Sequence, residues 1–247
     1  MTEAGKPHVT PYVESGSKKQ QVTNMFDKIA PKYDLLNRVL SLGIDTIWRK
    51  KAISRLNASD HKIILDVATG TADVALEIHK QLEPKEIIGL DISSEMISYG
   101  DKKIEKKGLT DSIKLEVGDS ENMRFTDNYF DAVTVAFGVR NFGNLEKGLT
   151  EMHRVLRKGG KTIILEFSRP KIFPFKQLFN FYFKNILPKI GGSTSSDDKA
   201  YDYLYRSVQV FPDYEDFAEI LERVGFRSVE WKSLSLGICT IYTGIKS

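Results

Sequence analysis

Residues 62–73 read Lys-Ile-Ile-Leu-Asp-Val-Ala-Thr-Gly-Thr-Ala-Asp, in which an apolar run leads directly into a glycine turn. A helical pattern of apolar residues begins near Ala72. A strand that ends in a tight turn before a helix is where α/β folds bind nucleotides. Gly70 allows a ligand to approach the backbone closely, and free N–H groups at the helix start can meet a carboxylate. This stretch therefore predicts a ligand site at the end of a strand.

Apolar runs of strand type recur after this stretch, with helical segments between them, over residues 86–90, 113–117, 132–136 and 162–167. Such alternation predicts a doubly wound, mostly parallel sheet. Residues 226–232 and 238–245 read as two more strands joined by a short turn, which predicts an antiparallel C-terminal hairpin at the sheet edge. We expect an α/β fold with a Rossmann-like, seven-stranded sheet.

Two helix starts carry capping residues. Ser93 or Ser94 can cap the helix that follows the second strand, and Asp213 can cap a helix over residues 217–224. Both caps are predicted from residue type and position alone.

The segment before the first strand reads as helical. Apolar residues recur at helical spacing from Val22 to Leu56, with breaks at Pro31 and Gly43. We expect residues 1–20 to form a flexible N-terminal arm and residues 21–247 to form a single domain. Within that domain, residues 21–60 should form a helical cap and residues 170–212 a lid insertion on the substrate side, including an irregular stretch over 191–199.

Composition narrows the classes of function. The chain has 247 residues, of which 41% are hydrophobic, enough for one α/β domain with a proper core. The net charge of +3 is too small to attract nucleic acid, and we expect no nucleic-acid partner. The single cysteine, Cys239, leaves no metal-binding cluster and fits a reducing compartment. We expect a cytoplasmic protein without a signal sequence or membrane span.

Acidic residues end the next two strands. Asp91 lies 21 residues after Gly70 at the end of the second strand, where a carboxylate can accept both hydroxyls of a ribose. Asp119 follows the third strand, near where an adenine amino group would point. The loop at Gly70 lacks the G-x-G-x-x-G spacing, which argues against a dinucleotide-binding dehydrogenase. The set resembles the class I S-adenosylmethionine-dependent methyltransferases.

Three further segments narrow the resemblance: YDLLNRVLSLGIDTIW at 33–48, FGVRN at 137–141 and RVLRKGGKTIILEFS at 154–168. They resemble signatures of the ubiquinone/menaquinone biosynthesis C-methyltransferases, and the likeness runs from about Val22 to the C-terminus. Three positions depart from the family. The segment at 33–48 commonly has histidine at the position of Asp45, and the segment at 154–168 commonly has proline at the position of Lys158. A polar residue at the end of the fourth strand is replaced by Ala136.

The resemblance implies an enzyme that binds S-adenosyl-L-methionine and needs no metal. By matching position it implies cofactor contacts at Thr71, Asp91, Asp119 and Ser120, which join Gly70 of the turn. It also makes Tyr33, Arg140 and Asn141 the substrate-side, catalytic residues. It implies C-methylation of a reduced prenylated quinol, demethylmenaquinol to menaquinol. The alternatives are the 2-polyprenyl-6-methoxy-1,4-benzoquinol of ubiquinone biosynthesis and another small molecule.

Methylation at carbon requires an electron-rich ring, so we expect the quinol and not the quinone to react. Arg140 and Asn141 are expected to hold a water or the developing phenolate while Tyr33 orients the ring. Arginine itself stays protonated, and Asp45 and His153 are weaker candidates for the base.

Residues 173–187 form the densest aromatic stretch of the chain. They read either as a helix that lines a prenyl-tail channel or touches the membrane interface, or as a helix that simply covers the sheet. Peripheral contact with the inner face of the membrane and a homodimer both stay open.

Other classes of function remain as alternatives. They are a small dehydrogenase, a nucleic-acid methyltransferase and a non-catalytic adenosine-binding module. A nucleic-acid methyltransferase would want a basic groove or an Asn/Asp-Pro-Pro-aromatic motif, and neither is visible.

Overall fold

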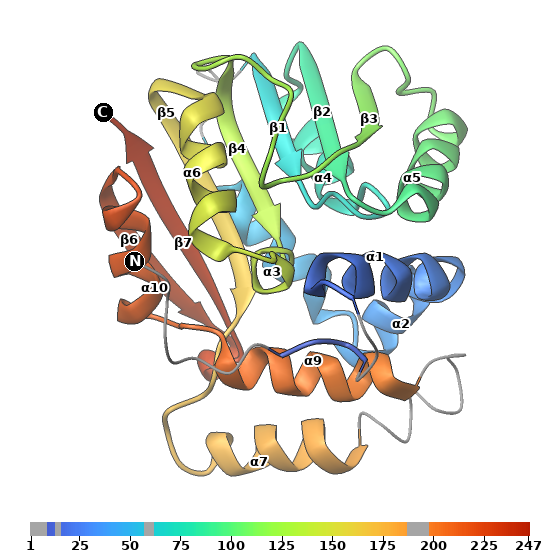
Figure 1. Cartoon of the computed structure of the whole chain (residues 1–247), viewed down its shortest axis with the longest axis vertical. Coiled ribbons are helices and arrows are strands. Elements are labelled where there is room, and N and C mark those ends of the chain that lie inside the picture. The colour runs from blue at the N-terminus through green and yellow to red at the C-terminus, as the bar shows by residue number, and fades with distance from the viewer. Residues whose placement is uncertain (1–8, 13–15, 57–61, 187–197) are drawn as a thin grey trace.

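A seven-stranded sheet forms the centre of the protein in this computed structural model, which describes residues 9–12, 16–56, 62–186 and 198–247 (Figure 1). The strand order is β3-β2-β1-β4-β5-β7-β6. Strands β1 to β5 pair in parallel, whereas β7 runs antiparallel to both β5 and β6. The predicted doubly wound sheet with a C-terminal antiparallel hairpin is confirmed.

The strands are β1 (Ile63–Val67), β2 (Glu86–Asp91), β3 (Ile113–Val117), β4 (Phe130–Ala136), β5 (Leu156–Phe167), β6 (Phe226–Leu234) and β7 (Cys239–Lys246). The longer helices are α1 (Lys18–Ile29), α2 (Tyr33–Leu40), α3 (Ile44–Ile53), α4 (Asp73–Leu82), α5 (Ser94–Lys106), α6 (Leu145–Val155), α7 (Phe175–Phe181), α9 (Asp198–Val210) and α10 (Glu215–Arg223). Short helical turns are η1 (Ala30–Lys32), η2 (Val139–Asn141), η3 (Tyr182–Ile186) and η4 (Ser235–Gly237).

Helices cover both faces of the sheet. Ile64 on β1 packs in one apolar cluster with side chains of α3 and α4, and Leu65 packs in a second cluster with α6 and α10. Both β1 side chains are fully buried. A parallel strand that is covered on both faces reads as a continuous apolar run, which is why the sequence revealed β1 so clearly.

Of the two predicted helix caps, one forms and the other does not. Ser93 caps α5 as expected, since its Oγ accepts a hydrogen bond from the Met96 N–H at 3.1 Å. The predicted cap at Asp213 is wrong: Tyr214 precedes α10, and Asp213 instead binds the guanidinium of Arg169 at 2.7 and 3.0 Å. A bidentate bond to an arginine is stronger than a bond to a neutral backbone N–H, so the carboxylate takes the arginine.

The end of the expected N-terminal arm belongs to the folded domain. Helix α1 begins at Lys18 because the Ser17 Oγ accepts from the Gln20 N–H. Tyr12 is buried and packs in a cluster with Val22 and with residues of α9. The arm is therefore shorter than the predicted 1–20. Residues 191–197 of the expected irregular stretch lie outside the described residues.

The cap helices lie beyond the carboxyl ends of the parallel strands. Figure 1 shows α1 and α2 next to those ends, with α9 and then α7 farther out. The fold therefore places two helical segments that are distant in sequence over the edge of the sheet where the ligand site was predicted.

Candidate functional site

A cleft opens at the carboxyl ends of β1 to β4 and is called the polar cleft here for the charged side chains in its wall. Its walls include Gly70, Asp91, Asp119 and Ser120, four of the five residues expected on the cofactor side. Tyr33 and Asn141 also line it, together with residues of α1. The structure thus gathers side chains that follow four different strands around one space.

Asp91 organises the glycine turn. Its Oδ2 accepts from the Gly70 N–H at 2.8 Å, and its Oδ1 accepts from the Ser93 N–H at 2.9 Å. Gly70 has a φ of 56°, in the region that favours glycine. Burial raises the pKa of Asp91 even though these N–H groups favour its charged form. The carboxylate therefore joins the turn after β1 to the end of β2 at the wall of the cleft.

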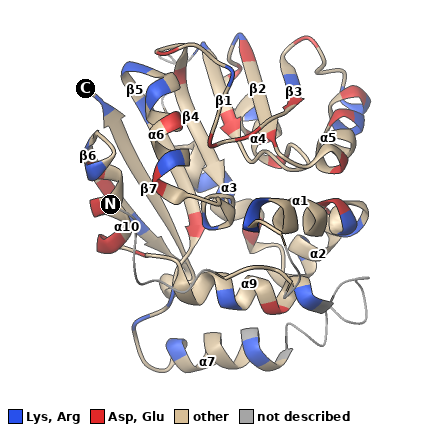
Figure 2. Cartoon of the chain, in the orientation of Figure 1, with Lys and Arg blue, Asp and Glu red and all other residues tan. Residues whose placement is uncertain are grey.

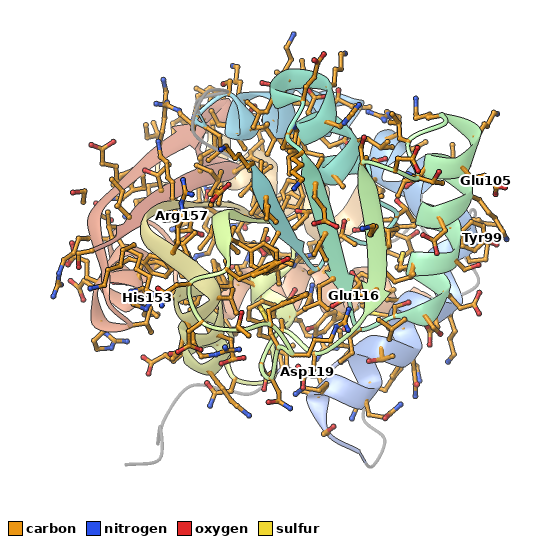
Figure 3. All side chains as sticks on the ribbon, turned by 90° about the horizontal axis from the view of Figure 1, so that it is seen from above. Tyr99, Glu105, Glu116, Asp119, His153 and Arg157 are labelled. Atoms are coloured by element: carbon orange, nitrogen blue, oxygen red, sulfur yellow. The ribbon has the colours of Figure 1, made fainter. Side chains whose placement is uncertain are left out.

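Asp119 lies beside α1 (Figure 3). Its Oδ2 accepts from the Lys19 Nζ at 2.7 Å, and the same ammonium lies 3.2 Å from Glu121. The hydrogen bond from Lys19 lowers the pKa of Asp119 against the opposing effect of its partial burial. Lys19 and Glu121 both line the cleft, so α1 closes this end of it.

Thr71 lies outside the cleft walls and takes part in an ionic network. Its Oγ1 donates to Asp34 at 2.5 Å and accepts from the Lys103 Nζ at 3.0 Å. The same ammonium contacts Asp34 at 2.8 Å and Asp73 at 2.7 Å. In this structure Thr71 therefore connects the cap helix α2 to α4 and α5.

An apolar cavity of about 410 Å³ adjoins the polar cleft. Side chains from α1, α2, α3, α7, α9 and η4 line it. Phe26, Tyr33, Phe137 and Asn141 line both spaces, so these four residues form the wall between them. The volume is in the range of small-molecule sites, and its lining suits an apolar ligand.

Arg140 and Asn141 face this cavity from η2. The Arg140 Nη1 donates to Glu166 at 2.8 Å, and the Glu166 side chain is fully buried at the end of β5. Burial raises the pKa of Glu166 despite the arginine beside it. Among the residues that the structure describes, the Arg140 Nε and the Asn141 Oδ1 have no hydrogen-bond partner although both atoms are buried. The hydrogen-bonding capacity of these two atoms is therefore unused within the described residues.

Neither of the other candidate bases is suitably placed. Asp45 lies at the cavity wall, but its carboxylate accepts from Ser41 and Arg38 and forms a very short ion pair with Arg49. His153 packs against Phe226 on the side of α6 and β6, well away from Asp119 in Figure 3. Asp45 therefore holds the cap helices together, and His153 has a packing role.

Several residues of this site were not predicted from the sequence. The sequence places Lys19 in the predicted arm, and Glu166 lies in the segment at 154–168 without a predicted role. Tyr203 of α9 lines the apolar cavity with its hydroxyl buried. Only contacts across the fold reveal these residues, since Tyr203 and Arg140 are 63 positions apart in the chain.

The sequence of this chain is similar to those of known methyltransferases. The model of the ubiE/COQ5 methyltransferase family matches residues 14–246. The demethylmenaquinone methyltransferase of Bacteroides fragilis is 47% identical over 238 residues, which cover 96% of this chain and 97% of the relative. The ubiquinone/menaquinone biosynthesis C-methyltransferase UbiE of Geobacter sp. strain M21 is 48% identical and covers 93% of this chain and 97% of its own length.

One solved structure illustrates the fold. An S-adenosylmethionine-dependent methyltransferase of Thermotoga maritima superposes with a TM-score of 0.64 at 16% identity, covering 91% of this chain and 99% of its own. At this identity the likeness shows the fold alone.

Proposed function

The chain belongs to the ubiE/COQ5 methyltransferase family, and on this basis we propose that it methylates a ring carbon of a reduced prenylated quinol with S-adenosylmethionine. The acceptor we favour is demethylmenaquinol, because two relatives with this name cover nearly all of the chain at 44–47% identity. The observation that carries the proposal is the shared wall of Phe26, Tyr33, Phe137 and Asn141 between a polar cleft and an apolar cavity.

The cleft residues fit adenosylmethionine. Asp91 can accept the ribose hydroxyls, and Asp119 can accept an adenine amino group once Lys19 gives up part of its contact. The start of α4 beside Gly70 offers N–H groups to the carboxylate of the methionine part. When bound there, the sulfonium supplies the methyl group. Thr71 is proposed to support this loop from behind, since it is joined to Asp34 and Lys103.

The apolar cavity fits the quinol ring and the start of its tail. The ring carbon would form a bond to the methyl group as the sulfur–carbon bond breaks, and the proton on that carbon would then leave to restore the aromatic ring. Electron density for this step comes from the hydroxyl next to the reacting carbon. We propose that Arg140 Nε and Asn141 Oδ1 bind that hydroxyl, or a water that takes its proton. Tyr33, which lines the cavity, would contact the ring.

Four exposed apolar residues line the cavity, namely Leu42, Ile44, Leu178 and Leu236. Ile172, Phe173 and Phe181 are also exposed, on α7 or just before it. Three lysines lie on this segment: Lys171 before α7, Lys176 within it and Lys184 after it. Figure 2 shows basic and no acidic residues here. A bilayer with anionic lipids would match both the apolar and the basic side chains. We propose that this surface rests on the membrane in which the quinol tail lies.

No helix within the described ranges is long and apolar enough to span a bilayer. Contact would therefore be peripheral. Phe179 is buried and packs against Tyr201 and Val208, so it faces away from the proposed membrane surface.

The triple variant Phe173→Ser, Leu178→Ser, Phe181→Ser should lose most of its binding to vesicles that contain anionic lipid. Three exposed apolar side chains, each contributing roughly 1–2 kcal/mol on insertion, predict at least a hundredfold weaker partition. Co-sedimentation with vesicles measures it. Val117→Ser, which removes an exposed apolar side chain from β3, is the matched control and should change nothing. Equal binding by the triple variant and the control would refute the membrane surface.

A comparison of two acceptors, each supplied separately, tests the proposed function. The purified protein is given adenosylmethionine and either reduced demethylmenaquinol or the reduced methoxy-benzoquinol, and each product is identified by mass. We expect demethylmenaquinol to react faster than the methoxy-benzoquinol. Faster transfer to the benzoquinol would favour the ubiquinone alternative, and transfer to neither would overturn the proposal.

A further inference from the structure

Tyr203 lines the apolar cavity, and its hydroxyl is buried. The residue lies on α9, is 2% exposed and lines the cavity with Met25 and Arg140. Its ring packs in a cluster with Tyr12, Val22 and Met25. The hydroxyl has no hydrogen-bond partner among the described residues.

A buried hydroxyl without a partner is costly, because the group has lost its bonds to water and gained none. A phenylalanine would fill the same space without this cost. Burial also raises the pKa of Tyr203, so the hydroxyl keeps its proton at neutral pH. The position therefore holds a neutral group that can both donate and accept one hydrogen bond to a ligand.

The other polar side chains on the cavity wall are largely engaged within the protein. Ser41 donates to Asp45, the Ser235 Oγ accepts from Trp48 at 2.9 Å, and the Tyr182 hydroxyl donates to the Leu40 carbonyl oxygen at 2.8 Å. The buried polar atoms left for a ligand include the Arg140 Nε, the Asn141 Oδ1 and the Tyr203 hydroxyl.

These three atoms match the hydrogen-bonding groups of a 1,4-dihydroxy ring. Arg140 Nε is a donor and Asn141 Oδ1 an acceptor, and the two residues are consecutive on η2. Together they can satisfy both the oxygen and the proton of one ring hydroxyl. The second hydroxyl then needs a separate group from another element. Tyr203 comes from α9, which packs against η2.

We propose that Tyr203 binds the second ring hydroxyl of the acceptor, the one not adjacent to the carbon that receives the methyl group. Tyr203 is then a positioning and specificity residue that selects the 1,4-dihydroxy ring. This inference deepens the proposed function and rests on it.

The test combines a substitution with an acceptor analogue. Tyr203→Phe is compared with the wild-type protein on the prenylated quinol and on the naphthol in which the second hydroxyl is replaced by hydrogen. For the wild type we expect kcat/KM to be about tenfold lower on the naphthol, the effect of one lost hydrogen bond. The variant should show a similar loss on the quinol and no further loss on the naphthol, since both changes remove the same bond.

Two controls separate this role from a structural one. The Tm of Tyr203→Phe should equal or exceed that of the wild type, and the Kd for adenosylmethionine should not change. Tyr205→Phe is the matched variant, because Tyr205 lies on the same helix but not among the cavity-lining residues.

Full activity of Tyr203→Phe on the quinol would overturn the inference and leave the proposed function intact. An equal loss by this variant on both acceptors would overturn it as well. Absence of transfer by the wild-type protein to any quinol would instead refute the proposed function.

Discussion

Replacing Arg140 by alanine should slow methyl transfer about 10³-fold and leave the Kd for adenosylmethionine within about threefold. The expected rate loss is that of a preorganised donor removed from a site where negative charge develops. Arg140 lines the apolar cavity and not the polar cleft, so cofactor binding should not depend on it. Single-turnover rates and a cofactor titration measure the two quantities separately.

The alanine variant has a structural cost that must be controlled. It leaves the fully buried Glu166 carboxylate without its arginine, which destabilises a fold by about 3–5 kcal/mol. The double variant Arg140→Met, Glu166→Gln removes both charges and should restore much of that stability without restoring the rate. A recovered rate in the double variant, or equal losses of rate and cofactor affinity in the single one, would contradict the substrate-side role of Arg140.

Replacing Asp91 by asparagine should weaken adenosylmethionine binding at least about a hundredfold. The carboxylate is expected to accept two ribose hydroxyls, and two hydrogen bonds to a charged group contribute roughly 3 kcal/mol or more. The asparagine side chain also has only one oxygen, so it cannot accept from both the Gly70 N–H and the Ser93 N–H as the carboxylate does. Isothermal titration with the cofactor measures the change.

The control position for this variant is Asp66, on the neighbouring strand β1. Asp66 lies near the end of β1, accepts hydrogen bonds from the hydroxyls of Thr69 and Thr134, and does not line the cleft. Burial raises the pKa of Asp66 to about 7, so a neutral amide resembles the form this residue takes in weak acid. Asp66→Asn should bind the cofactor nearly as well as the wild type. Comparable losses at both positions would mean that Asp91 acts on the loop and not on the ligand.

The fold could be predicted to a large extent because its centre is a parallel sheet with both faces covered. The predicted strand over residues 113–117 agrees with the bounds of β3 to the residue. The predicted strand over residues 162–167 is only the second half of β5, which begins at Leu156 and continues through Gly159, where φ is 75°. A local sequence does not reveal whether a neighbouring strand continues the pairing across such a glycine.

The site was harder to predict, since its contacts join distant segments. Asp91 could be chosen because strand ends of a parallel sheet meet at one edge. Lys19 closes the cleft from a helix whose start resembled a polar arm, and the Arg140–Glu166 pair joins η2 to the end of β5. The substrate-side residues came from the family signatures, and their surroundings came from the structure.

Methyl transfer is expected to occur between the polar cleft and the apolar cavity and to go to a carbon of a reduced ring. The most direct measurement supplies the protein with adenosylmethionine that carries a deuterated methyl group, together with demethylmenaquinol or its oxidised quinone, under anaerobic conditions. Mass spectrometry should find one labelled methyl on a ring carbon of the quinol product and none on the quinone. A label on a ring oxygen, or equal labelling of the quinone, would contradict the account.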